Sequence, residues 1–381
     1  MTGYFLTEQD ILLQKTVREF ANNQLAPNAG HYDQKAEFPW ENFQALAELG
    51  LFGLTIDEDF GGTGGTALQS AIVVEELSRG CAATGVIYIA HLSLCTRLIN
   101  LFGSIDLKKK ILASMVEGEK IGAFALTEPN SGSDSAALST TATKDGSDYI
   151  LNGTKHFITN AGEADIFVIM ATLDRNMRSR GINAFVVEKN TPGMTVTKQQ
   201  GKMGLRASST AEINFEGSRV PEGHMLGSKG QGFKQAMGAL NISRIEVAAQ
   251  ALGIAQSAYE SAVNYSQERQ AFGQNIANFQ GIQWMLVEMA TNIEAARHLV
   301  YNAASLSDKG LPFVKEASMA KLFASRIAVE TADKAVQIHG GTGYFAPTDV
   351  ERNYRDAKVT EIYEGSSEIQ RLIIARNILG F

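Results

Sequence analysis

A single carboxylate near the end of the chain stands in a setting that suits proton abstraction from carbon. Glu364 lies between the ring of Tyr363 and Gly365, within the segment IYEGSSEIQ at 362–370. Glycine allows a substrate or cofactor to approach the backbone closely. The tyrosine ring can shield the carboxylate from water, which raises its pKa towards that of a useful base. A polar turn ahead of a helix at 366–379 is the competing interpretation of the same residues.

A second polar segment offers groups that could hold a heterocyclic cofactor. Residues 124–134 read FALTEPNSGSD, and residues 157–160 read FITN. A turn of this composition presents backbone N–H groups. The hydroxyls of Thr127 and Ser133 add polar contacts for a ring edge or a pyrophosphate. Taken alone, residues 124–134 are also compatible with a plain surface loop.

Together, in this order and spacing, these segments resemble the acyl-CoA dehydrogenase family of flavoproteins. Three further collinear stretches agree with the resemblance: RQAFG at 269–273, QIHGGTG at 337–343 and YRDAK at 354–358. The resemblance runs from about Thr7 to Leu379. It implies FAD as the cofactor, an acyl-CoA as the substrate and a role in fatty-acid β-oxidation or amino-acid catabolism.

The resemblance also implies roles for individual residues. Glu364 would take the α-proton and flavin N5 the β-hydride, while the Glu364 backbone N–H and a flavin ribityl hydroxyl would hold the thioester oxygen. The residues expected to contact FAD are Phe124, Leu126, Thr127, Ser133, Phe157, Thr159, Arg269, Phe272, Gln280, Gln337, Gly340, Gly341, Ser366 and Glu368. The residues expected to contact the substrate are Ser133, Asn241, Arg244, Tyr363 and Gly365.

Two positions depart from patterns seen in parts of the family. Phe157 stands where many relatives carry tryptophan, so an aromatic face is kept without an indole N–H. Ser243 stands where some relatives carry their catalytic carboxylate, which favours Glu364 as the base and leaves Glu246 as an alternative. Arg244 lies on an apolar helix, where an arginine is either paired with a carboxylate or functional.

Partners follow from the same resemblance. Arg269, Phe272 and Gln280, with Gln337, Gly340 and Gly341, would reach FAD bound mainly by a neighbouring subunit. An arginine suits a pyrophosphate because its guanidinium donates two parallel hydrogen bonds. Such sharing implies an obligate homo-oligomer, usually a tetramer with dihedral symmetry. Reduced flavin would pass its electrons to an electron-transfer flavoprotein.

The substrate class rests on three stretches that look closest to short-chain and short/branched-chain members. They are MGLRASST at 203–210, NFQGIQ at 278–283 and KEASMAK at 315–321. We therefore expect a short acyl-CoA, linear or 2-methyl-branched.

Composition excludes several other classes. Among the 381 residues, 44% are hydrophobic and 20% charged, and the net charge is -7, which is ordinary for a globular protein and unlike a nucleic-acid-binding one. No uncharged apolar run reaches the ~18 residues that span a membrane, and the first residues do not form a secretory signal. Two cysteines fit a bacterial cytoplasm or a mitochondrial matrix. Six scattered histidines predict no metal site, and no dinucleotide fingerprint is present.

Hydrophobic periodicity divides the chain into three parts. Residues 1–118 are expected to form a helical domain, with Thr7 as a helix N-cap, a further helix starting near Thr66 and a buried apolar helix at 82–102. Residues 119–228 carry short β-branched runs and predict a small β-barrel-like domain, including a hairpin at 144–153 with Asp-Gly at its turn. Residues 229–381 predict a four-helix bundle. The fold class is therefore mainly α with a central β-domain.

Of three competing functions, the sequence leaves the first one open. An acyl-CoA oxidase on the same fold would let oxygen reach the reduced flavin. A non-catalytic relative, such as a nucleic-acid-binding one, would carry a basic extension and lose the carboxylate, and neither is seen. A purely structural helical bundle leaves the polar loops of the β-domain without a purpose.

Overall fold

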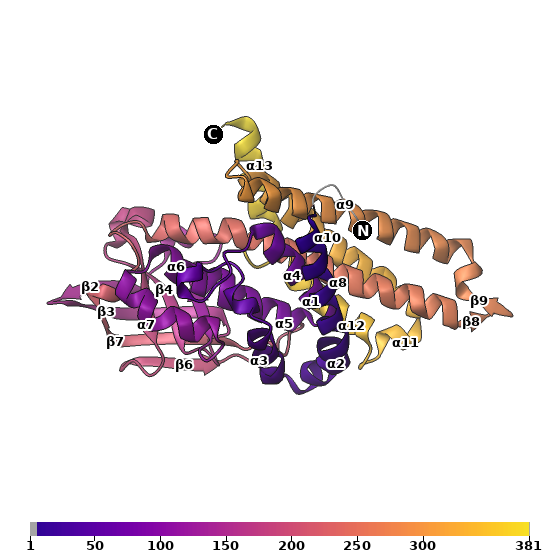
Figure 1. Cartoon of the computed structure of the whole chain (residues 1–381), viewed down its shortest axis with the longest axis horizontal. Coiled ribbons are helices and arrows are strands. Elements are labelled where there is room, and N and C mark those ends of the chain that lie inside the picture. Colours follow the sequence, from indigo (N-terminus) through magenta and orange to yellow (C-terminus); the bar gives the residue numbers. More distant parts are fainter. Residues whose placement is uncertain (1–5, 381) are drawn as a thin grey trace.

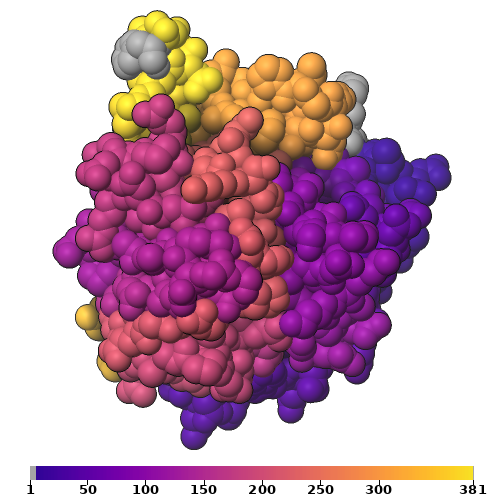
Figure 2. Space-filling model, turned by 90° about the vertical axis from the view of Figure 1, so that its left-hand side faces the viewer, coloured from indigo at the N-terminus to yellow at the C-terminus, as the bar shows by residue number. Residues whose placement is uncertain are grey.

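In the computed structural model, which describes residues 6–380, the sheet lies at one end of the molecule, and the helices pack against it and extend to the opposite end (Figure 1). Figure 2 shows the molecule from the end that carries the sheet. Residues of the sheet region and of the N-terminal helices lie side by side on this face, and C-terminal residues lie above them. The expected fold class is confirmed. The domain boundaries at 118/119 and 228/229 stay a prediction.

Capping residues fix where the first helices begin. The Thr7 side chain accepts a hydrogen bond from the backbone of Asp10, whose carboxylate accepts one from the Thr7 N–H. Thr66 and Gln69 form the same reciprocal pair, so both predicted helix starts are confirmed. The N-terminal helical elements are α1 Glu8–Phe20, η1 Ala21–Leu25, α2 Ala26–Lys35, α3 Trp40–Glu48, η2 Leu51–Gly53, η3 Glu58–Phe60, α4 Ala67–Gly80, α5 Ala82–Tyr88, η4 Ile89–Thr96, α6 Arg97–Phe102 and α7 Ile105–Val116.

The apolar segment Ala82–Phe102 forms the buried helix that its composition predicted. It runs through α5, η4 and α6 without a break. Within residues 6–380 this is the one helix long and apolar enough to cross a membrane, with a mean hydropathy of 1.4, and 83% of that window is buried inside the structure. Such burial is the property of a core helix packed on all sides.

The sheet has seven strands in the order β1-β4-β2-β3-β7-β6, with β5 paired to β4. Their bounds are β1 Gly122–Ala125, β2 Thr141–Asp145, β3 Asp148–Thr159, β4 Ile166–Thr172, β5 Ile182–Glu188, β6 Met194–Lys198 and β7 Thr210–Pro221. The expected hairpin is present, but its register differs by one residue from the expectation. Asp145 pairs with Asp148 in the ladder, so Gly146 and Ser147 form the turn, and Gly146 takes the positive φ of 59° that glycine tolerates best.

Helices return after the sheet. The remaining elements are η7 Glu222–His224, α8 Gly232–Glu268, β8 Gln270–Ala271, β9 Gln274–Asn275, η8 Ile276–Asn278, α9 Gln280–Asp308, α10 Val314–His339, α11 Gly341–Tyr344, α12 Asp349–Val359 and α13 Ser367–Leu379. The three long helices α8, α9 and α10 pack on one another, and the shorter α12 and α13 pack against α10. Helix α8 also contacts α4, η4 and β5, so it touches all three parts of the fold.

The YRDAK segment ties the three parts together. The Arg355 guanidinium donates to both carboxylate oxygens of Asp33 in α2, at 3.1 and 2.6 Å, and to the Met203 carbonyl at 3.0 Å. The neighbouring Asp356 carboxylate accepts from the Leu205 N–H at 2.5 Å. Burial raises the pKa of Asp356 to about 6. One turn of α12 therefore holds both an N-terminal helix and the loop that precedes β7.

A buried histidine joins the N-terminal helices to the first strand. The Gly122 N–H donates to His91 Nδ1 at 2.9 Å, so His91 Nε2 carries the proton and donates to the Met115 carbonyl at 3.0 Å. Burial lowers the pKa of His91 to about 4. The ring is therefore neutral at pH 7, with both nitrogens bonded.

We expect His91 to make the fold sensitive to acid. In the unfolded chain its pKa is near 6.5, so between pH 6.5 and 4 the unfolded state binds the extra proton and stability falls as the pH falls. From pH 7 to 4.5 this loss amounts to about 2–3 kcal/mol. His91→Gln keeps one donor and one acceptor without titrating, so its free energy of unfolding, from denaturant titrations, should fall less over this range. Parallel pH curves for the two proteins would contradict the assignment.

Candidate active site

The turn between α12 and α13 carries Glu364 in a left-handed backbone conformation. Its φ is 55°, and the following Gly365 has φ 95°. A non-glycine residue adopts positive φ at a cost, and such strain concentrates at functional sites. A side chain in place of Gly365 would bring a Cβ within 2.7 Å of Gln370 Nε2. The backbone angle therefore favours glycine, and a Cβ would also displace the end of the Gln370 side chain.

Hydrogen bonds from three helices hold this turn. Ser243 of α8 donates to Glu364 Oε2 at 2.7 Å, and Arg244 Nε donates to the Glu364 carbonyl at 3.3 Å. Lys321 Nζ of α10 donates to the Gly365 carbonyl at 2.8 Å. Gln370 Nε2 of α13 donates to both carbonyls, at 3.1 and 2.9 Å. A solvated polar turn would not collect buried partners from three elements.

The electrostatics of Glu364 favour a base. Burial raises its pKa, while the Ser243 hydrogen bond and the charges of Arg244 and Lys321 oppose that rise without cancelling it. The same burial lowers the pKa of Lys321 to about 8 and also lowers the pKa of Arg244. A carboxylate removed from water binds a proton more strongly, which is what abstraction of a weakly acidic C–H requires.

Tyr363 anchors the turn on the other side of Glu364. Its hydroxyl donates to the side-chain oxygen of Gln250 in α8, and its ring packs against the main hydrophobic core. Asn241, the remaining predicted substrate residue on α8, accepts from the Arg244 guanidinium. The structure thus brings four of the five predicted substrate residues together, namely Asn241, Arg244, Tyr363 and Gly365, around Glu364.

The loop after β1 is pinned by a buried ion pair. Lys155 of β3 donates to Glu128 at 2.7 Å and to the Leu126 carbonyl at 3.1 Å. Glu128 also accepts from the backbone N–H groups of Ser139 and Thr140. Burial would raise the pKa of Glu128, but Lys155 and these hydrogen bonds outweigh it and hold the pKa at about 2. Burial lowers the pKa of Lys155 to about 8.

The predicted FAD residues of the sheet lie close together around this pair. Thr127 accepts a backbone bond from His156 at 2.9 Å, which places the loop beside β3. Phe157 follows with φ 57° and is 66% exposed, an unusual degree of exposure for a phenylalanine. Phe124 and Thr159 are partly buried, Leu126 packs in the core and Ser133 is exposed.

The second set of predicted FAD residues lies at the other end of the molecule. Arg269 and Phe272 lie at and beyond the end of α8, where the β8–β9 hairpin projects from the bundle away from the sheet (Figure 1). The tip of α10 lies alongside, because His339 stacks on Tyr265 at 4.2 Å. All six residues of this set are exposed: Arg269, Phe272, Gln280, Gln337, Gly340 and Gly341. One chain therefore does not bring them to the loop after β1.

Ser366 and Glu368 lie at the start of α13, directly after the Glu364 turn. The Ser366 backbone carbonyl accepts from the Gln370 N–H, and the Glu368 side chain is exposed. They belong to the Glu364 end of the predicted site rather than to the loop after β1.

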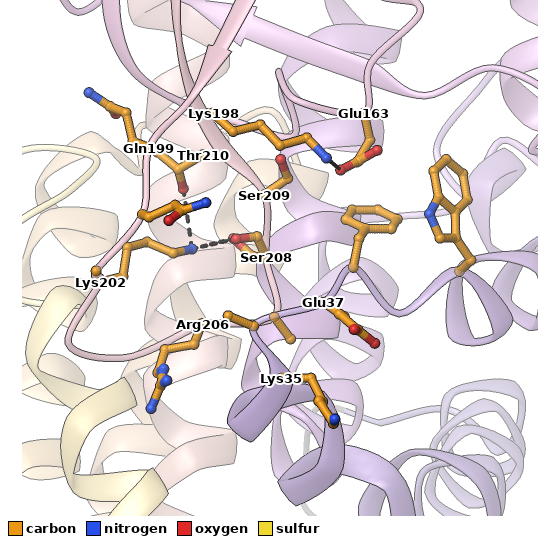
Figure 3. Close-up of a pocket in the computed structure, with 16 residues that line it drawn as sticks. Lys35, Glu37, Glu163, Lys198, Gln199, Lys202, Arg206, Ser208, Ser209 and Thr210 are labelled. Carbon is orange, nitrogen blue, oxygen red and sulfur yellow. Dashed lines mark hydrogen bonds and ion pairs between the residues drawn. The ribbon is translucent and has the colours of Figure 1, made fainter.

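A cleft of about 680 Å³ opens near the sheet residues, between the α2–α3 connection and residues 198–210 (Figure 3). Its charged lining residues are Lys35, Glu37, Glu163, Lys198, Lys202 and Arg206. In its wall, Gln199 lies 3.1 Å from His156 Nε2, and the His156 ring meets the Phe157 ring at 4.0 Å. The cleft thus borders the predicted cofactor residues without containing any of them.

Several residues form buried contacts that the sequence did not predict. Glu128 and Lys155 were overlooked because they are 27 positions apart and a lysine within a strand is usually solvated. Lys321 and Gln370 stood inside motifs, but nothing in their spacing showed that they bind the carbonyls of the Glu364 turn. Among residues 6–380 no group of three His, Cys, Asp or Glu side chains is placed to hold a metal.

We expect Lys155→Met to destabilise the protein strongly. Breaking a buried pair leaves Glu128 charged and unpaired, which costs about 3–5 kcal/mol. The matched control is Lys110→Met, because Lys110 pairs with Glu188 at 2.6 Å on the surface, and such a pair contributes at most ~1 kcal/mol. Denaturant unfolding of both variants checks this, and equal losses would contradict the buried-pair assignment. Adding Glu128→Leu to Lys155→Met should restore part of the stability.

Comparison with known proteins agrees with the geometry along the whole chain. The family models for the N-terminal, middle and C-terminal domains of acyl-CoA dehydrogenase match residues 7–119, 123–218 and 230–379. The short-chain specific acyl-CoA dehydrogenase of Clostridium acetobutylicum is 48% identical over 373 residues, covering 98% of each chain. The acryloyl-CoA reductase (NADH) of Anaerotignum propionicum is 47% identical, covering 99% of this chain and 96% of its own.

Solved structures of similar proteins also match this chain over nearly its whole length. Butyryl-CoA dehydrogenase from Megasphaera elsdenii superposes with a TM-score of 0.96 at 42% identity, over 99% of this chain and all of its own. A chain in the structure of the electron transferring flavoprotein of Acidaminococcus fermentans superposes with a TM-score of 0.97 at 44% identity, over 99% and 100%. This chain therefore belongs to the acyl-CoA dehydrogenase family of FAD-dependent oxidoreductases.

Proposed function

We propose that this enzyme oxidises a short acyl-CoA, linear or 2-methyl-branched, to the trans-2-enoyl-CoA, with Glu364 as the base. The observation that carries the proposal is the setting of Glu364: a partly buried carboxylate with a raised pKa, held by Ser243 and presented on a strained turn. The short-chain assignment is supported by the 48% identity to a short-chain specific relative.

The residues around the loop after β1 fit a flavin. A flavin needs an aromatic or apolar face and several donors along its polar edge. Phe157 offers an exposed ring, and Thr127, Ser133 and Thr159 offer hydroxyls on the neighbouring loop and strand. The buried Lys155–Glu128 pair keeps this loop in place. When bound, the flavin supplies the acceptor for the hydride that leaves the β-carbon.

Glu364 can serve the reaction with two of its groups. Ser243 binds Oε2, which leaves Oε1 to take the α-proton. Among the bonds of residues 6–380, none uses the Glu364 backbone N–H, so this donor is available for the thioester oxygen as negative charge develops there. Arg244 and Lys321 lie close enough to favour the charged carboxylate before the proton arrives.

Glu246, the alternative base, is engaged differently. Its Oε1 accepts from Ser70 at 2.7 Å and from Ser93 at 2.6 Å, both in N-terminal helices. Glu246 is fully buried on a regular helix, without the strained turn that presents Glu364. These contacts favour Glu364 as the base.

Two further parts of the proposal concern the electron acceptor and the direction of the reaction. We infer that electrons leave to an electron-transfer flavoprotein, because a close structural relative comes from the structure of such a protein. The 47% identity to an acryloyl-CoA reductase (NADH) supports a second candidate, reduction of a short enoyl-CoA at the same site. In the reductive direction Glu364 would act as the acid that returns the proton to the α-carbon, while a hydride would enter at the β-carbon.

Glu364→Gln should retain FAD but slow flavin reduction by butyryl-CoA at least ~10²-fold, since a positioned general base contributes that much or more. Stopped-flow absorbance of the flavin measures the rate. Glu361→Gln is the control, because that carboxylate lies three residues away and pairs with Lys358 at the surface. Rapid bleaching in Glu364→Gln would move the base elsewhere, with Glu246 as the first candidate.

We expect kcat/KM to be highest for acyl-CoAs with four or five acyl carbons. Each methylene adds about 0.8 kcal/mol only where a pocket can bury it, and overpacking costs more than that. The measurement is kcat/KM for unsubstituted acyl-CoAs, with an electron-transfer flavoprotein as the acceptor. Oxygen as the only acceptor should support little turnover. A profile rising to octanoyl-CoA would rule out the short-chain assignment, and fast oxygen consumption would indicate an oxidase.

The exposed set at the tip of α8 supports a homo-oligomer, for which we propose a tetramer. Phe272 is 95% exposed, and the whole set lies far from the loop after β1 of its own chain (Figure 1). A neighbouring copy would bring the Arg269 guanidinium to the pyrophosphate of FAD bound by the first copy. Burial of Phe272 between copies would remove the cost of exposing its ring.

Arg269→Ala should weaken FAD retention by roughly one to two decades in affinity, because a charge-assisted hydrogen bond is worth ~1.5–3 kcal/mol. Arg326→Ala is the control, since Arg326 is an exposed arginine of α10 that pairs only loosely with Glu330 at 3.7 Å. Flavin content after dialysis and mass from light scattering are the measurements. Full flavin occupancy with unchanged mass would make Arg269 a surface residue without this role.

A further inference from the structure

A cluster of polar side chains lies in the apolar interior where α4, η4 and α8 meet. Glu246 is only 2% exposed, and Ser70 and Ser93 are 1% exposed. Both hydroxyls donate to the same oxygen, Glu246 Oε1, at 2.7 and 2.6 Å. Glu246 Oε2 is buried and has no hydrogen-bond partner among the described residues. The cluster therefore contains one unused acceptor.

The position of Glu246 on α8 places it next to the reacting end of the acyl site. Glu246 follows Ser243 by three residues, so the two side chains share a face of the helix about 4.5 Å apart along its axis. Ser243 holds the Glu364 carboxylate. The charge of Glu364 contributes to raising the pKa of Glu246, which agrees with the two carboxyl groups lying near one another.

A buried carboxyl group with one unpaired oxygen is an exception that needs an explanation. Burial is the main cause of its raised pKa, and the charge of the partly buried Arg97 only moderates it. Neither a lysine nor an arginine among the described residues forms an ion pair with Glu246. A hydroxyl or amine on a ligand would supply the missing donor, whereas an alkyl chain would leave the oxygen unsatisfied.

We propose that Glu246, supported by Ser70 and Ser93, is a specificity-determining residue that selects a short acyl thioester with a hydrogen-bond donor, a hydroxyl or an amine, beyond the reacting carbons. This inference rests on the dehydrogenase function proposed above. Glu246 acts on recognition of the acyl tail and takes no part in the proton transfer. A site built to bond a donor rejects an analogue that lacks it, because its own polar group is then left unpaired.

The test compares three acyl-CoAs of nearly equal size. In 4-hydroxybutyryl-CoA a hydroxyl replaces the terminal methyl of pentanoyl-CoA, and 4-aminobutyryl-CoA carries an ammonium at the same place. The wild-type enzyme should show a higher kcat/KM for at least one donor-bearing substrate than for pentanoyl-CoA, and the better of the two identifies the donor. A wild-type preference for pentanoyl-CoA over both would overturn the proposal, without any variant being needed.

Variants then assign the preference to Glu246. Glu246→Leu replaces the carboxyl by an apolar group of similar size, and the ratio of kcat/KM between the donor-bearing substrate and pentanoyl-CoA should fall at least tenfold. Glu260→Leu, at a partly exposed position of α8 where the carboxylate pairs with Arg79, is the matched control and should leave this ratio unchanged. An unchanged ratio in Glu246→Leu would overturn the proposal.

Two further outcomes separate this inference from the proposed function. If no acyl-CoA, including butyryl-CoA, bleaches the wild-type flavin, the dehydrogenase function itself fails. If Glu246→Gln folds with full flavin but is bleached by none of the substrates, Glu246 acts as the base and the specificity role is overturned. Flavin content and melting temperature confirm that each variant is folded before its ratio is compared.

Discussion

The left-handed turn at Glu364 is the constraint on which the proposed chemistry depends. A glutamate in this conformation is unfavourable by itself, and it persists because buried donors from α8, α10 and α13 bind the two carbonyls of the turn. The packing of those three helices also removes water from the carboxylate, and this burial raises its pKa against the opposing charges of Arg244 and Lys321. The backbone strain and the raised pKa of Glu364 therefore have one common cause, the packing of three helices around a single turn.

Helix α8 connects this turn to the rest of the molecule. It carries Ser243 and Arg244 at the turn, Glu246 and Gln250 one and two helical turns further, and the exposed β8–β9 hairpin beyond its end. Because it also packs on α4, η4 and β5, the sheet and both groups of helices are positioned against the same rigid element. In a similar way, the buried Lys155–Glu128 pair holds the loop after β1 in position.

Much of the fold was predictable because its signals are local. Thr7, as an N-cap, and the expected helix start near Thr66 were both found where predicted, and β-branched runs marked β4, β5 and β7. The hairpin register was off by one residue because Gly146, rather than Asp145, takes the first central position of the turn. The predicted substrate residues around Glu364 met in space. The pair Lys155–Glu128 and the donors Lys321 and Gln370 were not predictable, since each joins segments far apart in sequence and a charged or polar residue gives no sign of its partner.

The order of residues along the chain has a consequence for biosynthesis. Ser243, Arg244 and Lys321 are all made before Glu364, but Gln370, which binds the carbonyls of both Glu364 and Gly365, is made after them. Domains form progressively as a chain leaves the ribosome. The sheet and most of the helices can therefore form on a nascent chain, whereas the ordered Glu364 turn cannot. The proposed catalytic turn is thus among the last parts of the fold that a growing polypeptide of this kind completes.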